Sequence, residues 1–181
     1  MTGVVVASQT YRTLGIHPTA RGFGWAVCEG PFSLVEAGVC TPIRHSRRFK
    51  SIREFERLLA RFQPAELVLE ALDGERRGDE RRTKRLALDL IACAADRGLS
   101  VEALKRDAVQ KAFEAVGART REEIAEAVAR HFPPLAHRLP PKRRAWDKED
   151  RQLAMFSAAA VVIANFQNGA TALLDELRDA A

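Results

Sequence analysis

The chain has 181 residues, of which 46% are hydrophobic and 29% charged, a composition typical of a globular protein with a sizeable core. No apolar run approaches the roughly 20 residues that span a bilayer, and the first ten residues lack the basic start and apolar core of a secretory signal, so we expect a cytoplasmic protein with no membrane partner. The net charge of +5 and the pI of about 9.5 favour a polyanionic partner, foremost nucleic acid, although a genomic base-composition bias toward arginine would also raise the charge.

Basic residues gather in three separated stretches of the sequence. Residues 41–53 contain five lysines and arginines and no acid, and residues 75–85 and 137–151 each contain six against three acids. Clusters of this kind are typical of surfaces that follow a phosphate backbone, although any one of them could be an ordinary solvated surface. The candidate nucleic-acid contacts in these stretches are Arg47, Arg48, Arg76, Arg77, Arg81, Arg82, Arg143 and Arg144.

The first half of the chain predicts strands joined by tight turns. We expect residues 1–11 to be a loosely ordered lead-in, followed by three short apolar strands that form an antiparallel meander. These strands are predicted at residues 12–17, 22–28 and 33–41. Apolar side chains at helical spacing then predict a helix over residues 50–62, and a further apolar run predicts a strand over residues 66–70. The helical crossover should place this fourth strand parallel to the first.

The second half of the chain has a mostly helical pattern. A fifth strand is predicted at residues 100–104, and the proline-rich, basic residues 133–144 indicate a lid or linker. Thr120 and Glu123 have the spacing of a capping box at the start of a helix. The helices are predicted at residues 80–97, 107–116, 121–132, 150–167 and 171–178. The whole order predicts an α/β protein of the ribonuclease-H-like class, with a mixed five-stranded sheet (three antiparallel strands, then two parallel ones) flanked by helices in a single domain over residues 1–181.

Acidic side chains stand where predicted elements begin or end. Glu70 ends the fourth strand, and Asp147 and Asp150 lie three residues apart just before a long apolar helix. Carboxylates in such places hold Mg²⁺ against a phosphodiester in nucleases. The alternatives are a Glu70 that faces solvent or pairs with an arginine, and aspartates that cap the helix or favour its dipole. The first strand ends with His17, where a further acid would complete the set.

Several segments together resemble the RuvC-type Holliday junction resolvases, a family of the ribonuclease-H-like superfamily. Residues 14–27 resemble the family's first hairpin, where Gly-Ile-Asp-Pro-Gly precedes a Thr-Gly-Trp-Gly strand, and residues 67–70 resemble the strand that carries its second acid. The sequence from Asp147 onward resembles its C-terminal Asp-x-x-Asp pair. Residues 106–113 and 120–125 resemble the two stretches in which the family has phosphate-contacting lysines. The equivalents of these lysines are Gln110 or Lys111 in the first stretch and Arg121 in the second.

This resemblance covers most of residues 12–166 and implies a metal-dependent, structure-selective endonuclease that hydrolyses phosphodiester bonds in branched or structured DNA. It implies Mg²⁺ or Mn²⁺ as the cofactor and a homodimer as the active form, because a four-way junction is two-fold symmetric and needs two cuts. The catalytic and metal-binding residues that it implies are His17, Glu70, Asp147 and Asp150, with Lys111 and Arg121 among the nucleic-acid contacts.

The histidine at position 17 is the main departure from the family, whose first ligand is an aspartate. Imidazole is a poor ligand of Mg²⁺ but suits Mn²⁺, Co²⁺ or Zn²⁺. His17 could instead be a general base for the attacking water, or it could mark a site that has lost its chemistry. Because the missing aspartate is the carboxylate that bridges two metals in the family, we expect a site with one metal or a preference for Mn²⁺.

Two other hypotheses fit the same pattern. The chain could be a catalytically impaired protein that binds nucleic acid or serves as a scaffold on the same fold, since basic clusters support binding as well as cleavage. It could also be one subunit of a larger assembly in which a partner completes the site. A test for metal-dependent cleavage is the simplest way to separate an active nuclease from a binding protein.

Overall fold

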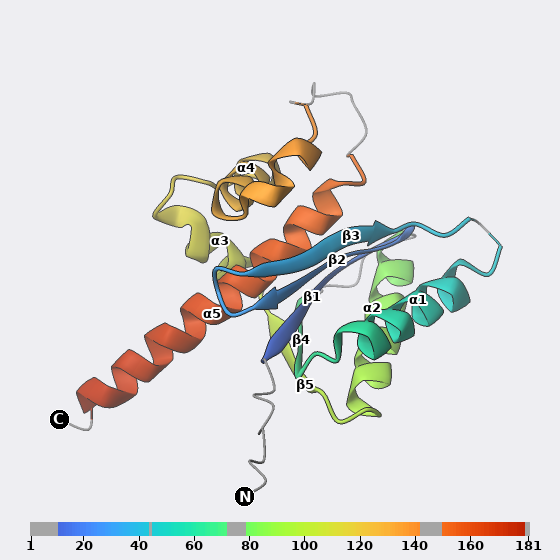
Figure 1. Ribbon diagram of the computed structural model, residues 1–181, viewed down its shortest axis with the longest axis horizontal. Coiled ribbons are helices and arrows are strands. Elements are labelled where there is room, and N and C mark those ends of the chain that lie inside the picture. The colour runs from blue at the N-terminus through green and yellow to red at the C-terminus, as the bar shows by residue number, and fades with distance from the viewer. Residues whose placement is uncertain (1–10, 44, 72–78, 142–149, 180–181) are drawn as a thin grey trace, which may run out of the picture.

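The computed structural model describes residues 11–43, 45–71, 79–141 and 150–179, which form a mixed β-sheet with helices on both of its faces (Figure 1). The strands are β1 (Arg12–Thr19), β2 (Gly22–Glu29), β3 (Leu34–Cys40), β4 (Glu66–Glu70) and β5 (Ser100–Leu104). Their order across the sheet is β3-β2-β1-β4-β5, with antiparallel pairing from β3 to β1 and parallel pairing from β1 to β5. The predicted mixed five-stranded sheet is therefore confirmed, and its antiparallel and parallel halves meet at β1.

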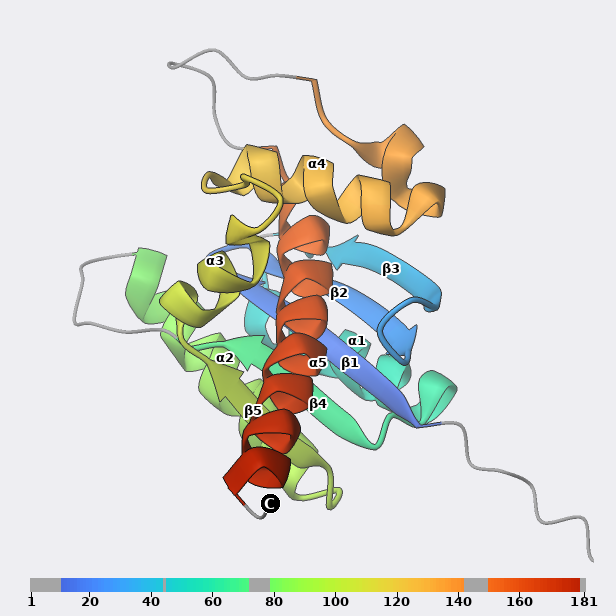
Figure 2. The ribbon, with the colours of Figure 1, turned by 90° about the vertical axis from the view of Figure 1, so that its left-hand side faces the viewer.

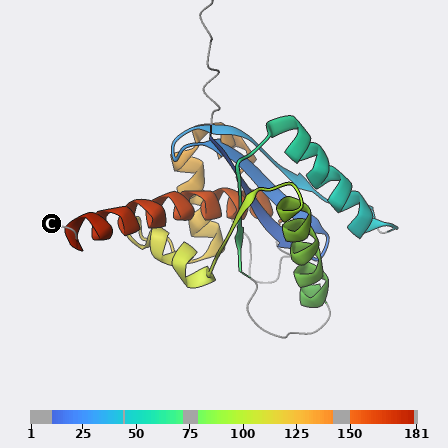
Figure 3. The same cartoon turned by 90° about the horizontal axis from the view of Figure 1, so that it is seen from below.

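The helices form one layer on each face of the sheet. Figure 3 shows α1 and α2 on one side of the strands, and α3, α4 and α5 on the other. In Figure 2 the helix α5 runs across the strands on its own face. The helices are α1 (Arg47–Phe62), α2 (Asp79–Ala95), α3 (Arg106–Glu114), α4 (Arg121–His131) and α5 (Leu153–Asp179), with a short 3-10 helix, η1 (Pro133–Arg138), inside the predicted lid or linker.

The alternation of side chains along the strands creates two apolar cores. Ile16 of β1 packs with Phe55 of α1 in the first core, whereas Val68 of β4 packs in the second core with residues of α3, α4 and α5. Successive strand residues point to opposite faces. His17 follows Ile16 by one residue and Glu70 follows Val68 by two, so both belong to the face that carries α5.

Two glycines allow α5 to lie directly on the middle of the sheet. A Cβ atom at Gly15 would lie well inside 3.0 Å of the Ala158 carbonyl, and one at Gly24 would lie as close to the Ala154 carbonyl. Carbon atoms in ordinary contact are about 3.5–4.0 Å apart, so any side chain at these positions would push the helix away. Because Gly24 pairs with His17 across β1 and β2, this close approach places the first turns of α5 beside the histidine.

The last helix is longer than the sequence pattern predicts. The pattern predicts two helices, at residues 150–167 and 171–178, but α5 runs without a break from Leu153 to Asp179. The division is wrong because Gly169, which lies between the two predicted helices, costs only about 1 kcal/mol in a helix. The segment Leu153–Glu176 is long and apolar enough to cross a membrane, but most of its apolar stretch is buried in the fold, as in a core helix.

Other boundaries differ by a few residues from the prediction. The helix α1 begins at Arg47 rather than at residue 50. The capping box at the start of α4 is confirmed: the Glu123 amide donates to Thr120 Oγ1 at 3.2 Å, and the Thr120 amide donates to the Glu123 carboxylate at 2.9 Å. Tyr11 of the predicted lead-in is exposed, and residues 1–10 lie outside the described residues.

Candidate active site

The C-terminal ends of β1 and β4 bring His17 and Glu70 together. The parallel register pairs Ile16 with Leu69, so the next residues of the two strands lie beside each other. The Nδ1 atom of His17 is 3.9 Å from Oε2 of Glu70, and the two side chains are 7% and 14% exposed. The structure therefore places two of the four predicted catalytic residues side by side in a sheltered position.

His17 is a neutral imidazole with an unsatisfied nitrogen. Burial, together with the nearby cations Arg121 and Arg106, lowers the pKa of His17 to about 3. At neutral pH its contact with Glu70 is therefore not an ion pair. The Nδ1 atom is buried and has no hydrogen-bond partner among the described residues. Since an unpaired buried polar atom costs about 1–3 kcal/mol, this nitrogen is suited to a ligand that would satisfy it.

Glu70 experiences two opposing influences. Burial raises the pKa of its carboxyl group, and the positive charges of Arg106 and Arg121 lower it by a smaller amount. The same two arginines act on both members of the pair formed by His17 and Glu70. The candidate site thus combines one carboxylate, one neutral imidazole and two guanidinium groups.

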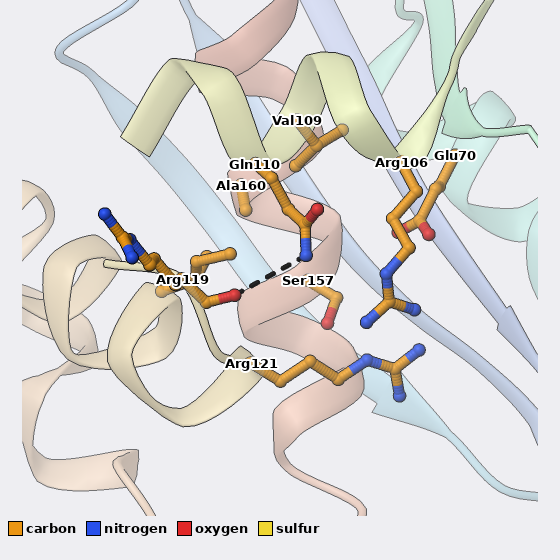
Figure 4. Close-up of a pocket in the computed structure, with 9 residues that line it drawn as sticks. Glu70, Arg106, Val109, Gln110, Arg119, Arg121, Ser157 and Ala160 are labelled. Atoms are coloured by element: carbon orange, nitrogen blue, oxygen red, sulfur yellow. Dashed lines mark hydrogen bonds between the residues drawn. The ribbon is translucent and has the colours of Figure 1, made fainter. Parts of the chain in front are cut away.

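A small pocket with both polar and apolar lining residues lies beside Glu70 (Figure 4). It is lined by Arg106 and Gln110 of α3, Arg121 of α4 and Ser157 of α5. In Figure 4 the guanidinium groups of Arg106 and Arg121 extend toward the same opening, with Ser157 close to both. The pocket volume of about 30 Å³ is close to that of one water molecule in the liquid. The pocket therefore fits a water molecule, an ion or one oxygen of a phosphate, and not a whole nucleotide.

Arg106 is a site residue that the sequence analysis missed. It is the first residue of α3 and reaches Glu70 because β5 ends beside β4. Glu70 pairs with Leu104 in that register, and the Ala71 amide donates to the Leu104 carbonyl at 2.7 Å. In the sequence, Arg106 follows a predicted strand by two residues. This position points to the site only when the parallel pairing of β4 and β5 is known.

The predicted phosphate contacts of α3 and α4 differ in their positions. Arg121 and Gln110 line the pocket, whereas Lys111 is exposed and does not. The Gln110 side chain donates to the Arg119 carbonyl at 3.5 Å, and the Arg119 side chain points away from the pocket (Figure 4). Ser157 was not predicted either. The feature that sets it apart in the sequence is that it is a polar residue within the apolar run of α5.

The described members of the basic clusters lie outside this pocket. Arg47 donates to the carbonyls of Pro42 and Ala20, each at 3.3 Å. Arg48 forms a two-pronged ion pair with Asp89. The candidates at the exposed start of α2 are Arg81 and Arg82. The candidates that lie outside the described residues are Arg76, Arg77, Arg143, Arg144 and Asp147.

Asp150 forms the turn that leads into α5. Its Oδ1 accepts a hydrogen bond from the Gln152 amide at 2.8 Å, and its carbonyl accepts one from the Leu153 amide at 3.2 Å. This is the helix-start role that the sequence analysis gave as the alternative to metal binding. Within the residues that the structure describes, no three His, Cys, Asp or Glu side chains come together as a metal site. The structure thus does not group Asp150 with His17 and Glu70.

The two facing side chains fit part of the coordination shell of a divalent ion. Metal–nitrogen and metal–oxygen bonds are about 2.1 Å long, so the two atoms that lie 3.9 Å apart can bind one ion between them. A neutral imidazole and a carboxylate together suit Mn²⁺ or Zn²⁺ better than Mg²⁺. The neighbouring arginines oppose a cation, and a phosphate bound between them would offset that repulsion.

The solved structures with the same fold include Holliday junction resolvases. RuvC of Thermus thermophilus in complex with a Holliday junction substrate matches with a TM-score of 0.66 and 16% sequence identity, over 89% of this chain and 96% of that one. A further structure of Thermus thermophilus RuvC matches with a TM-score of 0.63 and 18% identity, over 88% and 96% of the two chains. The yeast mitochondrial Holliday junction resolvase Ydc2 matches with a TM-score of 0.58 and 14% identity, over 88% and 80%.

No protein-family model and no curated protein sequence matches the chain. Its relationship to the resolvases is therefore one of three-dimensional structure. Identities of 14–18% establish the fold and nothing finer. The chain is an α/β protein with the RuvC-like form of the ribonuclease-H-like fold.

Proposed function

We propose that this protein is a metal-dependent, structure-selective endonuclease that cuts branched DNA of the Holliday junction type. The observation that carries the proposal is the buried Nδ1 of His17, which has no hydrogen-bond partner in the described part of the chain and faces the Glu70 carboxylate near the ends of two adjacent parallel strands. A protein of the same fold binds a Holliday junction, and the net charge of +5 suits a polyanionic substrate. The enzyme would act as a homodimer, because a four-way junction is two-fold symmetric and needs two cuts.

The divalent ion would be held by His17 and Glu70, with Asp147 as a further predicted ligand. Asp150 would join them only by giving up its hydrogen bond from the Gln152 amide. We expect one ion rather than two, because an imidazole cannot bridge two ions as a carboxylate does. The site also has one negative charge fewer than it would have with an aspartate. The same ligand favours Mn²⁺ over Mg²⁺. When bound, such an ion polarises the phosphodiester and lowers the pKa of a coordinated water molecule.

The pocket beside Glu70 would hold an oxygen of the phosphate that is cut. Arg106 and Arg121 present two guanidinium groups to this opening, and a guanidinium group binds phosphate oxygens with charge-assisted hydrogen bonds. Their positive charge would stabilise the negative charge that develops during hydrolysis. Ser157 would add a hydroxyl donor from the third element of the pocket.

The second candidate is a protein of the same fold that binds branched DNA without cutting it. The observation that favours it is the charge balance of the site, in which one carboxylate stands beside two arginines. His17, which is neutral, occupies the position where the family resemblance leads us to expect an acid. A phosphate would bind to such a site without any metal.

Cleavage of a four-way junction by the purified full-length chain separates the two candidates. We expect cleavage with Mn²⁺ to be faster than with Mg²⁺. Glu70→Gln should lower the rate by about 100-fold or more, the effect typical of losing a catalytic group, while junction affinity stays nearly unchanged. His17→Asp should raise Mg²⁺-dependent cleavage if the histidine only replaces a ligand, and should lower cleavage with every metal if the histidine is a general base.

The matched control is Glu36→Gln, which removes a carboxylate of β3 that pairs with Arg61 on the face opposite the site. It should change neither cleavage nor affinity. If neither the wild type nor His17→Asp cuts a junction with any divalent ion, the enzyme proposal fails and the DNA-binding function replaces it.

A further inference from the structure

A second depression, larger than the pocket beside Glu70, lies between the end of β3 and the first turns of α1. It is an open groove of about 630 Å³, within the range of about 300–1,000 Å³ that encloses small-molecule ligands. Its lining includes Cys40, Phe49, Lys50, Arg53 and Arg57, none of which takes part in the candidate active site. The groove has room for the base and sugar of a nucleotide, which the smaller pocket lacks.

Phe49 gives this groove an exposed aromatic wall. It is 61% exposed, whereas Phe55 and Phe62 of the same helix are at most 5% exposed. The guanidinium carbon of Arg53 lies 5.7 Å from the centre of the Phe49 ring, a cation–π contact. An aromatic ring and a guanidinium group held together at the surface form a platform on which a nucleobase can stack.

The groove is also cationic. Its lining holds Lys50, Arg53 and Arg57 with a single carboxylate, Glu54. Arg57 Nη1 is 2.9 Å from Glu54 Oε2, and such exposed pairs contribute little to stability, so a phosphate can compete for this arginine. Across the described parts of the chain, Lys50 and Arg53 form no ion pair. Two positive charges of the groove are therefore available to phosphates.

The groove lies at the same end of the sheet as His17, because its lining includes Cys40, the last residue of β3. Across the sheet, Pro18 of β1 pairs with Phe23 of β2, and Phe23 pairs with Cys40 of β3. Cys40 is therefore level with Pro18, the residue after His17, and lies two strands away from it. Neighbouring strands are about 4.8 Å apart, which gives a lateral separation of about 10 Å. The groove opens beside α1, whereas the candidate active site lies on the face that carries α5, so the path between them is longer than this lateral distance. One DNA strand would reach both by passing around this end of the sheet.

Arg47 fixes the position of the groove relative to the active site. Its guanidinium group donates to the carbonyl of Pro42, which lines the groove, and to the carbonyl of Ala20, in the turn between β1 and β2. The turn at Ala20 follows directly after β1, which carries His17. A preformed spacing between two binding sites lowers the entropy that a shared ligand must lose on binding.

We propose that this groove binds an unpaired segment of a DNA strand next to the site of cleavage, with a base stacked on Phe49 and Arg53. Lys50 and Arg57 would bind the adjoining phosphates. The proposal rests on the proposed function, because the point where the arms of a branched DNA meet exposes bases that an intact duplex keeps stacked. A duplex would have to unstack before it could present a base to Phe49. The groove would therefore provide the preference for branch points over intact duplex.

Binding of a fluorescent oligothymidylate of about 12 nucleotides to the full-length chain in EDTA tests this proposal without any cleavage. Phe49→Leu keeps an apolar side chain and removes the ring, and we expect it to weaken binding at least fivefold. The matched control is Phe32→Leu, because Phe32 is 80% exposed in the turn between β2 and β3, at the other end of these strands. Phe32→Leu should bind as the wild type does, and both variants should keep the melting temperature of the wild type.

The contribution of charge is measured by the salt dependence of the same binding. Lys50→Gln should lower the slope of log affinity against log salt by about 0.7, the value for one phosphate contact on a single strand. Arg130→Gln on α4 is the control and should leave the slope unchanged. Unaltered binding by Phe49→Leu, an equal loss in Phe32→Leu, or tighter binding of oligouridylate than of oligothymidylate would each overturn the proposal.

The groove and the active site can fail separately in these experiments. If Phe49→Leu loses affinity and the wild type cuts no junction, the groove proposal stands and the nuclease proposal falls. If the wild type cuts junctions and Phe49→Leu binds and cuts as well as the wild type, the groove proposal falls and the nuclease proposal stands.

Discussion

Because His17 is neutral, the candidate site does not need a metal ion to offset repulsion between two carboxylates. Its imidazole is neutral at physiological pH, so Glu70 does not face a second carboxylate at the end of β1. An aspartate in this place would set two carboxylates close together, which raises the pKa of one of them unless a cation lies between them. Arg106 and Arg121 already lower the pKa of Glu70 against the effect of burial. The histidine thus separates the folding of this site from the binding of a metal.

The buried imidazole predicts a loss of stability in acid. In the unfolded chain His17 takes up a proton below its ordinary pKa of about 6.5, whereas in the fold its pKa is about 3. The unfolded state therefore binds more protons between these two values, and stability falls as the pH falls through this window. One pKa unit corresponds to about 1.4 kcal/mol, so His17 should cost about 2–3 kcal/mol of stability at pH 4.5 relative to pH 7.5.

Urea unfolding at the two pH values measures this loss. His17→Gln cannot titrate and should lose about 2–3 kcal/mol less than the wild type between pH 7.5 and pH 4.5. The comparison between variants is needed because Glu70, whose pKa burial raises, contributes in the opposite direction. His45→Gln removes an exposed histidine and should behave as the wild type. Equal losses in the wild type and in His17→Gln would mean that the imidazole takes up its proton as readily in the fold as in the unfolded chain.

Among the helices, α5 makes the most extensive contact with the sheet. It crosses β1, β2, β3 and β4 on one face of the sheet (Figure 2). It also brings Ser157 to the pocket beside Glu70. Its close approach depends on Gly15 and Gly24, which leave no Cβ atom between the helix backbone and the strands. The position of this helix therefore controls both the stability of the fold and the geometry of the candidate site.

A methyl group at Gly24 should displace α5. Its Cβ atom would overlap the backbone of Ala154, which cannot move without the helix, so we expect Gly24→Ala to lower the free energy of unfolding by about 3 kcal/mol. Gly169→Ala is the matched control, because nothing lies within 4 Å of a Cβ atom there. It should raise stability by about 0.5–1 kcal/mol, since alanine favours a helix over glycine. Chemical denaturation measures both changes, and a Gly24→Ala variant as stable as the wild type would contradict the observed packing.

The order of the elements could be predicted because each one depends on a local pattern. Short apolar runs mark the strands, and the capping box of Thr120 and Glu123 marks the start of α4. The meeting of His17 and Glu70 also follows from the sequence, since both lie near the C-terminal ends of strands that a helical crossover makes parallel. The start of α1 does not follow from it, because Arg47 is held by a carbonyl 27 positions earlier in the chain.

The remaining site residues could not be predicted from local pattern. Arg106 lies beside Glu70 only because β5 pairs with β4 and ends level with it. Ser157 reaches the pocket only because α5 crosses the sheet at that level. Both positions depend on how distant elements pack against each other. The periodicity of apolar residues in the sequence gives no information about that packing. The resemblance to the resolvases marks Gln110 or Lys111, and of these only Gln110 lines the pocket.

In the molecule as a whole, the positive charges are not distributed as the three basic stretches of the sequence indicate. The pocket beside Glu70 takes its arginines from the starts of α3 and α4, which lie outside the three basic stretches. Arg48, within the first stretch, is paired with Asp89, and Arg47 is bound to backbone carbonyls. The groove along α1 uses other members of that stretch, Lys50 and Arg53. The proposed phosphate-binding surface would thus be built from packed elements rather than from one run of sequence.

This layout predicts which arginines determine the salt dependence of junction binding. Each phosphate contact on duplex DNA contributes about 0.9 to the slope of log affinity against log salt. Replacing Arg106 and Arg121 together with glutamine should therefore lower the slope for a four-way junction by about 1.8, measured by fluorescence anisotropy over a salt series in EDTA. The matched control is Arg97→Gln, since Arg97 is an exposed arginine that pairs with Glu56 and lies outside both the pocket and the groove. A double variant with the slope of the wild type would remove the pocket from the DNA interface, because neutral glutamines cannot replace two released counterions.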